Sequence, residues 1–380
     1  MTSEINLPAG IRSRFVPEIN GLNMHVLEAG FDTPNRPLIL LLHGFPELAY
    51  SWRKVMLPLA AAGYHVVAPD QRGYGRTVGR NAGWDNRYDG DLRSFSLLNL
   101  VRDALGLVSA LGYRTVDAVV GHDFGSPVAA WCALVRPDIF RSVALMSAPF
   151  GGPPPLPPRK GVDRIHDELA ALPRPRKHYQ WYYSTREADA NMHRCPQGVH
   201  AFLRAYYHQK SADWKQNRPF VLASWTAAEI AKLPDYYVME LGKGMAETVA
   251  PEMPSAAEIA ACKWLPDDEL RVYSTEYGRT GFQGGLQWYR CGTSGAFNAE
   301  LEVFHGRTID VPSCFISGKS DWGPYQRSGD PEKILRNACT QFRGFHLVDG
   351  AGHWVQQEQP AETSRLLLEF LKDVRSAVPA

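Results

Sequence analysis

An aspartate in a glycine-flanked turn is the residue of this chain best placed to act as a nucleophile. The turn is Gly121-His-Asp-Phe-Gly125, with Asp123 at its centre. An apolar run enters the turn, and a helical run with Pro127 in its first turn leaves it. This pattern is typical of an elbow that raises a nucleophile above the end of a strand. Because Asp is also a common helix cap, capping of that helix is the alternative role of Asp123.

A carboxylate nucleophile restricts the chemistry that is possible. Attack on a carbonyl carbon would give an unstable anhydride, whereas displacement at a saturated carbon gives an ester that water then hydrolyses. The substrate of Asp123 is therefore expected to carry its leaving group on saturated carbon, as an epoxide or an alkyl halide does.

An acid and a histidine follow later in the chain, each just after an apolar run. Asp321 lies just past Cys314-Phe-Ile-Ser-Gly318, and His353 ends the loop Gly350-Ala-Gly-His353. The order nucleophile, acid, histidine is that of triads built on such elbows. We predict that Asp321 orients the imidazole of His353 and that His353 activates water.

Two backbone amides complete the predicted machinery. The segment His43-Gly-Phe-Pro46 follows the first buried run, and the amides of Phe45 and Phe124 are predicted to hold the oxyanion formed during ester hydrolysis. His43 is predicted to orient this loop. The residues predicted to line the substrate pocket are His43, Pro46, Trp288 and Trp354.

Strands and helices that alternate along the chain are needed to bring these residues together. Continuous apolar runs predict strands that are buried on both faces, and a helical pattern spans residues 97–111. This alternation predicts an α/β fold with a mostly parallel central sheet flanked by helices. The runs that predict strands are Pro37–Leu42, Tyr64–Ala68, Thr115–Val120, Ser142–Met146, Val311–Ser317 and Phe345–Val348.

A change of composition after Phe150 predicts an inserted domain. The proline-rich segment 151–158 suits a linker, and the residues after it are rich in Trp, Tyr and helical pattern without further buried-strand runs. We predict a core formed by residues 1–150 and 301–380 and a helical lid formed by residues 151–300.

Composition argues against several classes of partner. Lys and Arg number 41 against 40 Asp and Glu, so the charge of +1 gives no reason to expect nucleic acid or an anionic membrane. The N-terminus lacks the features of a secretory signal, and no apolar run is long enough to span a membrane. The six scattered cysteines lack metal-ligand spacing and indicate free thiols in a reducing compartment. We expect a cytoplasmic protein without a metal or organic cofactor.

Five stretches of the chain together resemble the epoxide hydrolases of the α/β-hydrolase superfamily. The resemblance covers about residues 37–370 and implies an α/β-hydrolase fold and the hydrolysis of a small, mostly apolar epoxide to a diol. The stretches are His43-Gly-Phe-Pro, Asp70-Gln-Arg-Gly-Tyr-Gly, Gly121-His-Asp-Phe-Gly, Gly318-Lys-Ser-Asp-Trp and Gly350-Ala-Gly-His-Trp.

Two lid tyrosines follow from the same resemblance. His178-Tyr-Gln-Trp-Tyr-Tyr183 and Gly281–Arg290 look like the family's two tyrosine segments, so Tyr179 and Tyr289 are expected to donate their hydroxyls to the epoxide oxygen. A leaving alkoxide is strongly basic and needs such donors. Tyr182 and Tyr183 lie close to Tyr179 in sequence and stay open as alternatives.

Two other functions fit many of the same residues. Haloalkane and haloacetate dehalogenases share most of these motifs, but Phe124 stands where the dehalogenases would have a tryptophan or an arginine that binds the halide. A non-catalytic receptor for a small molecule on this fold is the third alternative. The lid segment around Trp225–Trp264 matches no part of the family pattern.

Overall fold

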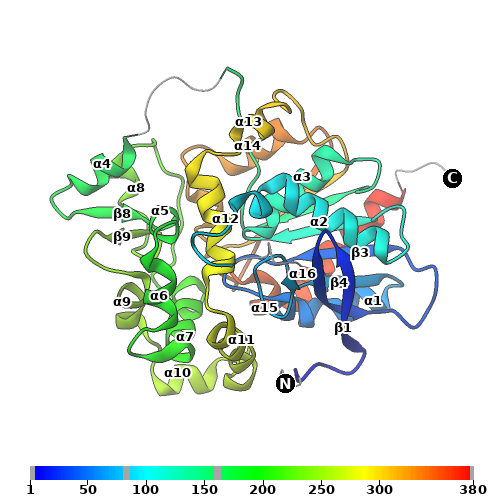
Figure 1. Ribbon diagram of the computed structural model, residues 1–380, viewed down its shortest axis with the longest axis horizontal. Coiled ribbons are helices and arrows are strands. Elements are labelled where there is room, and N and C mark those ends of the chain that lie inside the picture. Colours follow the sequence, from blue (N-terminus) through cyan, green and yellow to red (C-terminus); the bar gives the residue numbers. More distant parts are fainter. Residues whose placement is uncertain (1–4, 80–85, 158–163, 377–380) are drawn as a thin grey trace.

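A mixed β-sheet forms the centre of the computed structural model, which describes residues 5–79, 86–157 and 164–376 (Figure 1). The strand order is β1-β2-β4-β3-β6-β7-β10-β11, and β5 pairs with β2. The pairs from β4 through β11 are parallel, whereas β1 and β2 are antiparallel to their neighbours. The strands are β1 (Ile11–Ile19), β2 (Leu22–Ala29), β3 (Leu38–Leu42), β4 (His65–Pro69), β5 (Val78–Gly79), β6 (Ala118–His122), β7 (Val143–Met146), β10 (Ser313–Gly318) and β11 (Phe342–Val348).

Each of the six apolar runs named above forms a parallel strand of this sheet, within a few residues of the expected bounds. Side chains alternate between the two faces, as the two-residue period of a strand requires. In β3, Leu38, Leu40 and Leu42 belong to the core on one face, and Ile39 and Leu41 to the core on the other. Both faces are therefore covered, which explains why these strands are continuously apolar.

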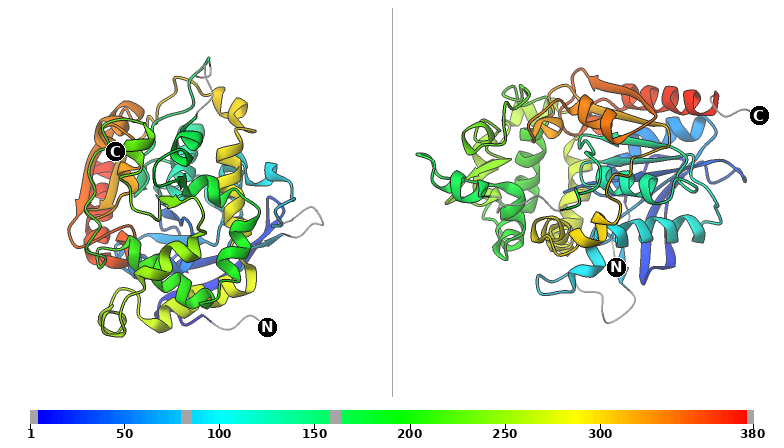
Figure 2. Two further views of the ribbon diagram at one scale, coloured as in Figure 1. Left: turned by 90° about the vertical axis from the view of Figure 1, so that its left-hand side faces the viewer. Right: turned by 90° about the horizontal axis from the view of Figure 1, so that it is seen from above.

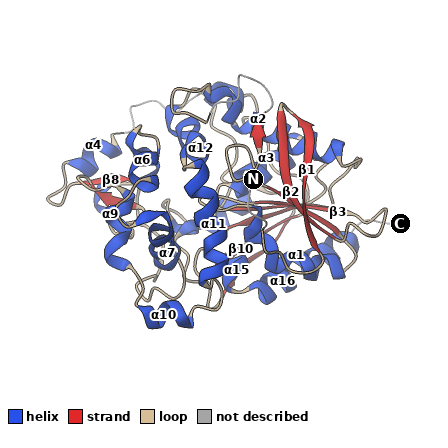
Figure 3. Ribbon diagram, turned by 60° about the horizontal axis from the view of Figure 1, so that its bottom comes forward, coloured by secondary structure: helices blue, strands red, loops and turns tan. Residues whose placement is uncertain are grey.

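Helices cover the two faces of the sheet (Figure 3). One core contains buried residues of α2 (Leu97–Ala110) and α3 (Gly125–Val135). The other contains residues of α1 (Arg53–Ala61), α15 (Val355–Glu358) and α16 (Pro360–Ser376). The remaining helix of this part, α14 (Pro331–Ala338), contacts β11. Short 3-10 turns are η1 (Ala49–Trp52), η2 (Leu92–Phe95) and η4 (Gly323–Tyr325).

Between β7 and β10 the chain forms a mostly helical assembly at one end of the sheet (Figures 1 and 2). Its helices are α4 (Ile165–Ala170), α5 (Tyr179–Tyr183), α6 (Glu187–His193), α7 (Gly198–Lys210), α8 (Ala227–Ile230), α9 (Met245–Val249), η3 (Ala250–Glu252), α10 (Ala256–Ala261), α11 (Asp267–Thr280), α12 (Gln283–Ser294) and α13 (Asn298–Glu302). We call residues 151–300 the lid.

Two pairs of strands were not anticipated from the sequence. The hairpin of β1 and β2 has a broken hydrophobic alternation, and β2 buries His25 and Glu28. In the lid, β8 (Arg176–His178) pairs with β9 (Val238–Glu240) as a small antiparallel sheet. Each of these lid strands is too short to produce a recognisable pattern.

The lid packs tightly on the rest of the chain near α12. A Cβ atom added at Gly284 would lie 1.9 Å from the carbonyl oxygen of Gly73, so only glycine permits this approach. The hydroxyl of Tyr207 donates to the carbonyl of Pro46 (2.9 Å), and that of Tyr277 to the carbonyl of Glu47 (3.1 Å). Helices of the lid are therefore fixed to the loop that follows β3.

Candidate active site

Asp123 lies in a strained turn between β6 and α3. Its φ angle is +51°, in the left-handed region that non-glycine residues seldom adopt. A Cβ at Gly121 would lie 2.1 Å from the carbonyl oxygen of Gly125, and a Cβ at Gly125 would lie 2.2 Å from that of Leu42. Both flanking glycines are therefore required by close backbone contacts, and the turn directs the Asp123 side chain away from the helix.

The carboxylate of Asp123 is held by two groups from distant parts of the chain. The Phe45 amide donates to Oδ1 over 2.9 Å, and Nε2 of His353 donates to Oδ2 over 3.1 Å. The N-cap of α3 is Phe124, with no side-chain hydrogen bond at that cap. The side chain of Asp123 therefore does not cap the helix. Its Oδ1 is instead bound by the backbone amide of Phe45.

Asp321 and His353 are brought together at the carboxyl ends of β10 and β11. Nδ1 of His353 donates to Oδ1 of Asp321 over 3.0 Å. The carboxylate of Asp321 also accepts from the amide of Gly323 (2.7 Å) and from Oγ of Ser317 (2.8 Å). Because both imidazole nitrogens face carboxylate acceptors, His353 carries both ring protons in this arrangement.

The charges of this group are mutually stabilising. Burial raises the pKa of Asp123, but the hydrogen bond and charge of His353 outweigh it and lower that pKa well below its usual value. For His353, burial and the charge of Lys210 lower the pKa, but the carboxylates of Asp321 and Asp123 raise it above its usual value. These directions favour ionised carboxylates at Asp123 and Asp321 and a protonated imidazole at His353.

A second buried ion pair, which the sequence analysis did not identify, supports the first. Nδ1 of His122 donates to Oε2 of Glu47 over 2.5 Å, and its Nε2 donates to the carbonyl oxygen of His353 over 2.7 Å. Glu47 also accepts from Gln356 (2.8 Å) and from the Gly44 amide (3.2 Å). The signal that could have revealed this pair is position, since Glu47 follows the His-Gly-Phe-Pro segment and His122 precedes Asp123.

The loop after β3 is shaped to bring the Phe45 amide to Asp123. A Cβ at Gly44 would lie 2.4 Å from the Cβ of Asp123, so this residue has to be glycine. His43 is fully buried, accepts from the amide of Gln71 (3.1 Å) and donates to the carbonyl of Gly44 (2.9 Å). Its ring nitrogens are thus used to hold the loop. Pro46 is buried beside them.

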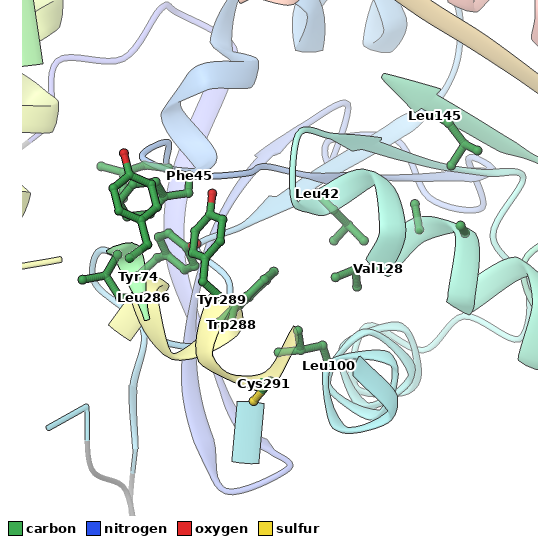
Figure 4. Packing of buried hydrophobic residues seen from close by; sticks show 14 of the residues in the cluster. Leu42, Phe45, Tyr74, Leu100, Val128, Leu145, Leu286, Trp288, Tyr289 and Cys291 are labelled. Atoms are coloured by element: carbon green, nitrogen blue, oxygen red, sulfur yellow. The ribbon is translucent and has the colours of Figure 1, made fainter. Parts of the chain in front are cut away.

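Tyr289 lies over this centre from the lid helix α12. Its ring is 5.5 Å from that of Phe45, whose amide donates to Asp123 (Figure 4). The ring is also 5.1 Å from that of Phe124, the residue that follows Asp123. Burial and the nearby carboxylate of Asp123 raise the pKa of Tyr289 well above its usual value. The phenol is therefore protonated and able to donate.

Tyr179 on α5 lies near Tyr289, and its hydroxyl is not committed as a donor. Its ring is 6.0 Å from that of Tyr289, and its hydroxyl accepts from Nε2 of Gln180 over 3.2 Å. Burial and the charge of Asp123 raise its pKa. Tyr183 instead donates to the hydroxyl of Tyr206 (3.2 Å), and the Tyr182 ring lies under the ammonium of Lys177.

The two tryptophans expected at the pocket contact the site through their rings. Trp288 packs edge-on against Phe124 at 5.2 Å, and Trp354 packs against His353 at 4.8 Å. Their indole N–H groups donate to backbone carbonyls, that of Trp288 to Arg72 (3.0 Å) and that of Trp354 to Tyr207 (2.8 Å). Neither N–H is free to bind a halide.

Three further features concern disulfides, membrane-spanning helices and metal sites. The six cysteines are unpaired. Within the described parts of the chain, no helix is long and apolar enough to cross a membrane. In those same residues no group of three or more His, Cys, Asp and Glu side chains is arranged to hold a metal ion.

Comparisons with known proteins identify the family to which this fold and site belong. The alpha/beta hydrolase fold family matches residues 37–360. Epoxide hydrolase A of Mycobacterium tuberculosis is 33% identical over 358 residues, which cover 93% of this chain and 95% of that protein. The chain therefore belongs to the epoxide hydrolases of the alpha/beta hydrolase fold family.

Solved structures agree with this assignment. An epoxide hydrolase from an endophytic Streptomyces superposes with a TM-score of 0.76 at 32% identity, covering 98% of each chain. Epoxide hydrolase A from Mycobacterium thermoresistibile gives a TM-score of 0.72 at 31% identity and covers 95% of this chain and 98% of that chain. The similarity thus includes the lid as well as the sheet.

Proposed function

We propose that this protein hydrolyses an epoxide to a vicinal diol through an ester formed on Asp123. The observation that carries the proposal is that the two oxygens of the Asp123 carboxylate have different partners. Oδ1 accepts from the Phe45 amide, and Oδ2 faces Nε2 of His353. One oxygen is thereby held as the future ester carbonyl, and the other is left to attack. A receptor without catalysis has no use for this arrangement.

In the first half-reaction, Oδ2 of Asp123 attacks an epoxide carbon and the carbon–oxygen bond of the ring breaks. The hydroxyls of Tyr179 and Tyr289 donate to the oxygen that leaves, and one of them transfers its proton to it. Their raised pKa values keep these phenols protonated until that moment. The product is an alkyl ester with a neighbouring hydroxyl.

In the second half-reaction, water attacks the acyl carbon of the ester. His353, oriented by Asp321, first passes its Nε2 proton to the tyrosinate left by the first step and then takes a proton from that water. The amides of Phe45 and Phe124 stabilise the oxyanion on Oδ1. Collapse breaks the bond between the acyl carbon and Oδ2, and the departing Oδ2 takes the proton of the new acid hydroxyl, so the diol leaves with Oδ2. The regenerated carboxylate and imidazolium restore the resting charges.

The aromatic side chains around the site favour a small, mostly apolar substrate. Aromatic rings surround the nucleophile, and their mutual contacts are edge-on, as for Phe45 with Tyr183 and with Tyr289. Such rings bury apolar groups and leave the two phenols as polar contacts. We therefore propose aryl and alkyl epoxides as the substrate class, and no metal or organic cofactor has a role in this scheme.

We also propose the division into a core of residues 1–150 and 301–380 and a lid of residues 151–300, together with a cytoplasmic location. Support for the division comes from the element order, because α4 through α13 lie between β7 and β10. Support for the location comes from the unpaired thiols, which suit a reducing compartment.

An oxygen-18 experiment under single-turnover conditions tests the ester directly. Enzyme in molar excess is mixed with styrene oxide in water enriched in oxygen-18, and both the diol and the peptide that contains Asp123 are analysed by mass spectrometry. The proposal predicts an unlabelled first diol and one oxygen-18 atom in Asp123. A labelled first diol would mean direct attack by water and would reject the ester.

The same preparation separates the proposal from dehalogenation. Because the indole N–H groups of Trp288 and Trp354 are already bonded, we expect no bromide release from 1-bromohexane under conditions where styrene oxide is consumed. Bromide release without diol formation from any epoxide would assign the site to dehalogenation instead.

A further inference from the structure

A buried lysine that the proposed reaction does not yet use lies beside the triad. Lys210 is the last residue of α7 and is only 3% exposed. Its ammonium lies 5.4 Å from the ring centre of Tyr206, 5.1 Å from that of Tyr237 and 5.3 Å from that of Trp354. Among residues 5–79, 86–157 and 164–376, no carboxylate lies within salt-bridge distance of it.

Burial of the Lys210 ammonium costs free energy that its contacts must compensate. A buried ammonium without an adjacent acid loses its hydration, and cation–π contacts return about 0.5–2 kcal/mol each. Burial lowers the pKa of Lys210, and the carboxylates of Asp123, Asp321 and Glu47 oppose that effect at longer range. The three acids of the site therefore favour the charged form of this lysine against the effect of burial.

Lys210 is also fixed in position relative to His353. Its carbonyl oxygen accepts from the backbone amide of His353 over 2.8 Å. The Trp354 ring contacts both the His353 ring, at 4.8 Å, and the ammonium. The indole N–H is tied to the carbonyl of Tyr207, so this ring cannot turn away. Lys210 therefore keeps its position relative to the imidazole when the charge of His353 changes.

We propose that Lys210 is the group that makes His353 a base once Asp123 has been esterified. This inference rests on the proposed function. Esterification removes the negative charge of Asp123 and leaves the Nε2 proton of His353 without its acceptor. The ammonium then repels the imidazolium, and the Nε2 proton of His353 passes to the tyrosinate left by epoxide opening. The neutral imidazole can now accept a proton from water.

The other charged groups around His353 do not provide this effect. Asp321 favours the imidazolium in both states. His122, 5.1 Å from the His353 ring, is hydrogen-bonded to the carboxylate of Glu47. Tyr206 and Tyr237 have pKa values raised well above their usual range by burial and stay neutral. With Asp123 esterified, Lys210 is the cation near the imidazole that no adjacent acid neutralises within the described residues.

The pH dependence of ester hydrolysis tests this role. The decay of the alkyl-enzyme formed from styrene oxide, a neutral probe, is followed by stopped-flow tryptophan fluorescence and quenched-flow mass spectrometry between pH 5 and 9. Wild type is compared with Lys210→Met and Lys210→Arg. Loss of the charge raises the pKa of His353 in the ester, so the acidic limb of the Lys210→Met profile moves up by about one pH unit. Lys210→Arg retains the wild-type limb.

Each outcome has a distinct meaning. Identical limbs in wild type and Lys210→Met, with ester formation intact, would overturn the role of Lys210 and leave the proposed function standing. An equal shift in Lys210→Arg would do the same, because it would assign the effect to packing. Absence of any ester in wild type would instead reject the proposed function. If circular dichroism shows that Lys210→Met is unfolded, Lys210→Gln replaces it in the same comparison.

Discussion

Nε2 of His122 donates to the carbonyl oxygen of His353 over 2.7 Å, so the residue before the proposed nucleophile holds the residue proposed as the base. The other nitrogen of His122 is bonded to Glu47, which in turn accepts from Gln356. Loops that follow β3, β6 and β11 are joined in this way below the carboxylate of Asp123. The geometry of the triad therefore depends on a buried ion pair that does not touch the substrate position.

Glu47→Gln tests the contribution of that pair. The substitution removes the buried carboxylate that is hydrogen-bonded to His122, and breaking a buried pair costs about 3–5 kcal/mol. We expect a loss of that size in the free energy of unfolding, measured by urea denaturation. The matched control is Asp349→Asn, which removes the exposed partner of Lys319 and should leave the unfolding curve unchanged. Equal effects of the two changes would contradict this interpretation.

Substitution of single lid tyrosines by phenylalanine shows which hydroxyls act as general acids and which tyrosines only pack. Tyr179→Phe and Tyr289→Phe should each slow ester formation by about 10²-fold, the usual contribution of a general acid, and the double variant should form no detectable ester. Tyr183→Phe loses only its bond to Tyr206, and its ester formation should stay within a few-fold of wild type. Rapid-mixing kinetics with styrene oxide measure all four rates. A large loss in Tyr183→Phe alone would reassign the first acid.

Gly44→Ala tests the closeness of the loop to the nucleophile. The added Cβ would lie 2.4 Å from that of Asp123, which must displace the Phe45 amide from Oδ1. Loss of one oxyanion donor typically costs about 10²–10³-fold in rate, and we expect kcat to fall by that factor. Gly242→Ala is the control, because a Cβ there meets nothing within 4 Å. Full activity of Gly44→Ala would show that this amide is dispensable.

The raised pKa of His353 has a consequence for stability. In the unfolded chain its pKa is 6.5, and in the folded protein it is higher. Protonation therefore stabilises the fold below pH 6.5, and this contribution is lost as the pH rises through the folded value. The difference in unfolding free energy between wild type and His353→Asn should shrink above pH 6.5. Denaturation curves at successive pH values measure it, and a difference that grows with pH would contradict the charge assignment.

Much of the sheet could be predicted because its parallel strands are buried on both faces and therefore read as apolar runs. The hairpin of β1 and β2 escaped prediction because β2 buries polar residues such as Glu28, whose partners Arg12 and Arg14 lie across the hairpin on β1. The lid strands β8 and β9 pair only residues 176–178 with 238–240, so their partners are set by tertiary contacts.

The site could be predicted where a motif imposes local geometry, as at Asp123, Asp321 and His353. Supporting residues were harder to find. His122 lies inside a recognised motif and Glu47 directly follows another, but their pairing joins loops 75 residues apart. Lys210 ends an ordinary lid helix, and its proximity to the triad follows from how the lid packs.

The most direct test of the ester on Asp123 is intact-protein mass spectrometry of His353→Ala after incubation with styrene oxide. Without the base, water should not be activated, and the ester should accumulate. We predict a mass increase equal to the whole epoxide, located at Asp123 by peptide mapping and absent in the double variant Asp123→Ala/His353→Ala. Diol formation by wild type with no mass increase in His353→Ala, under conditions where that variant is folded, would contradict the covalent mechanism.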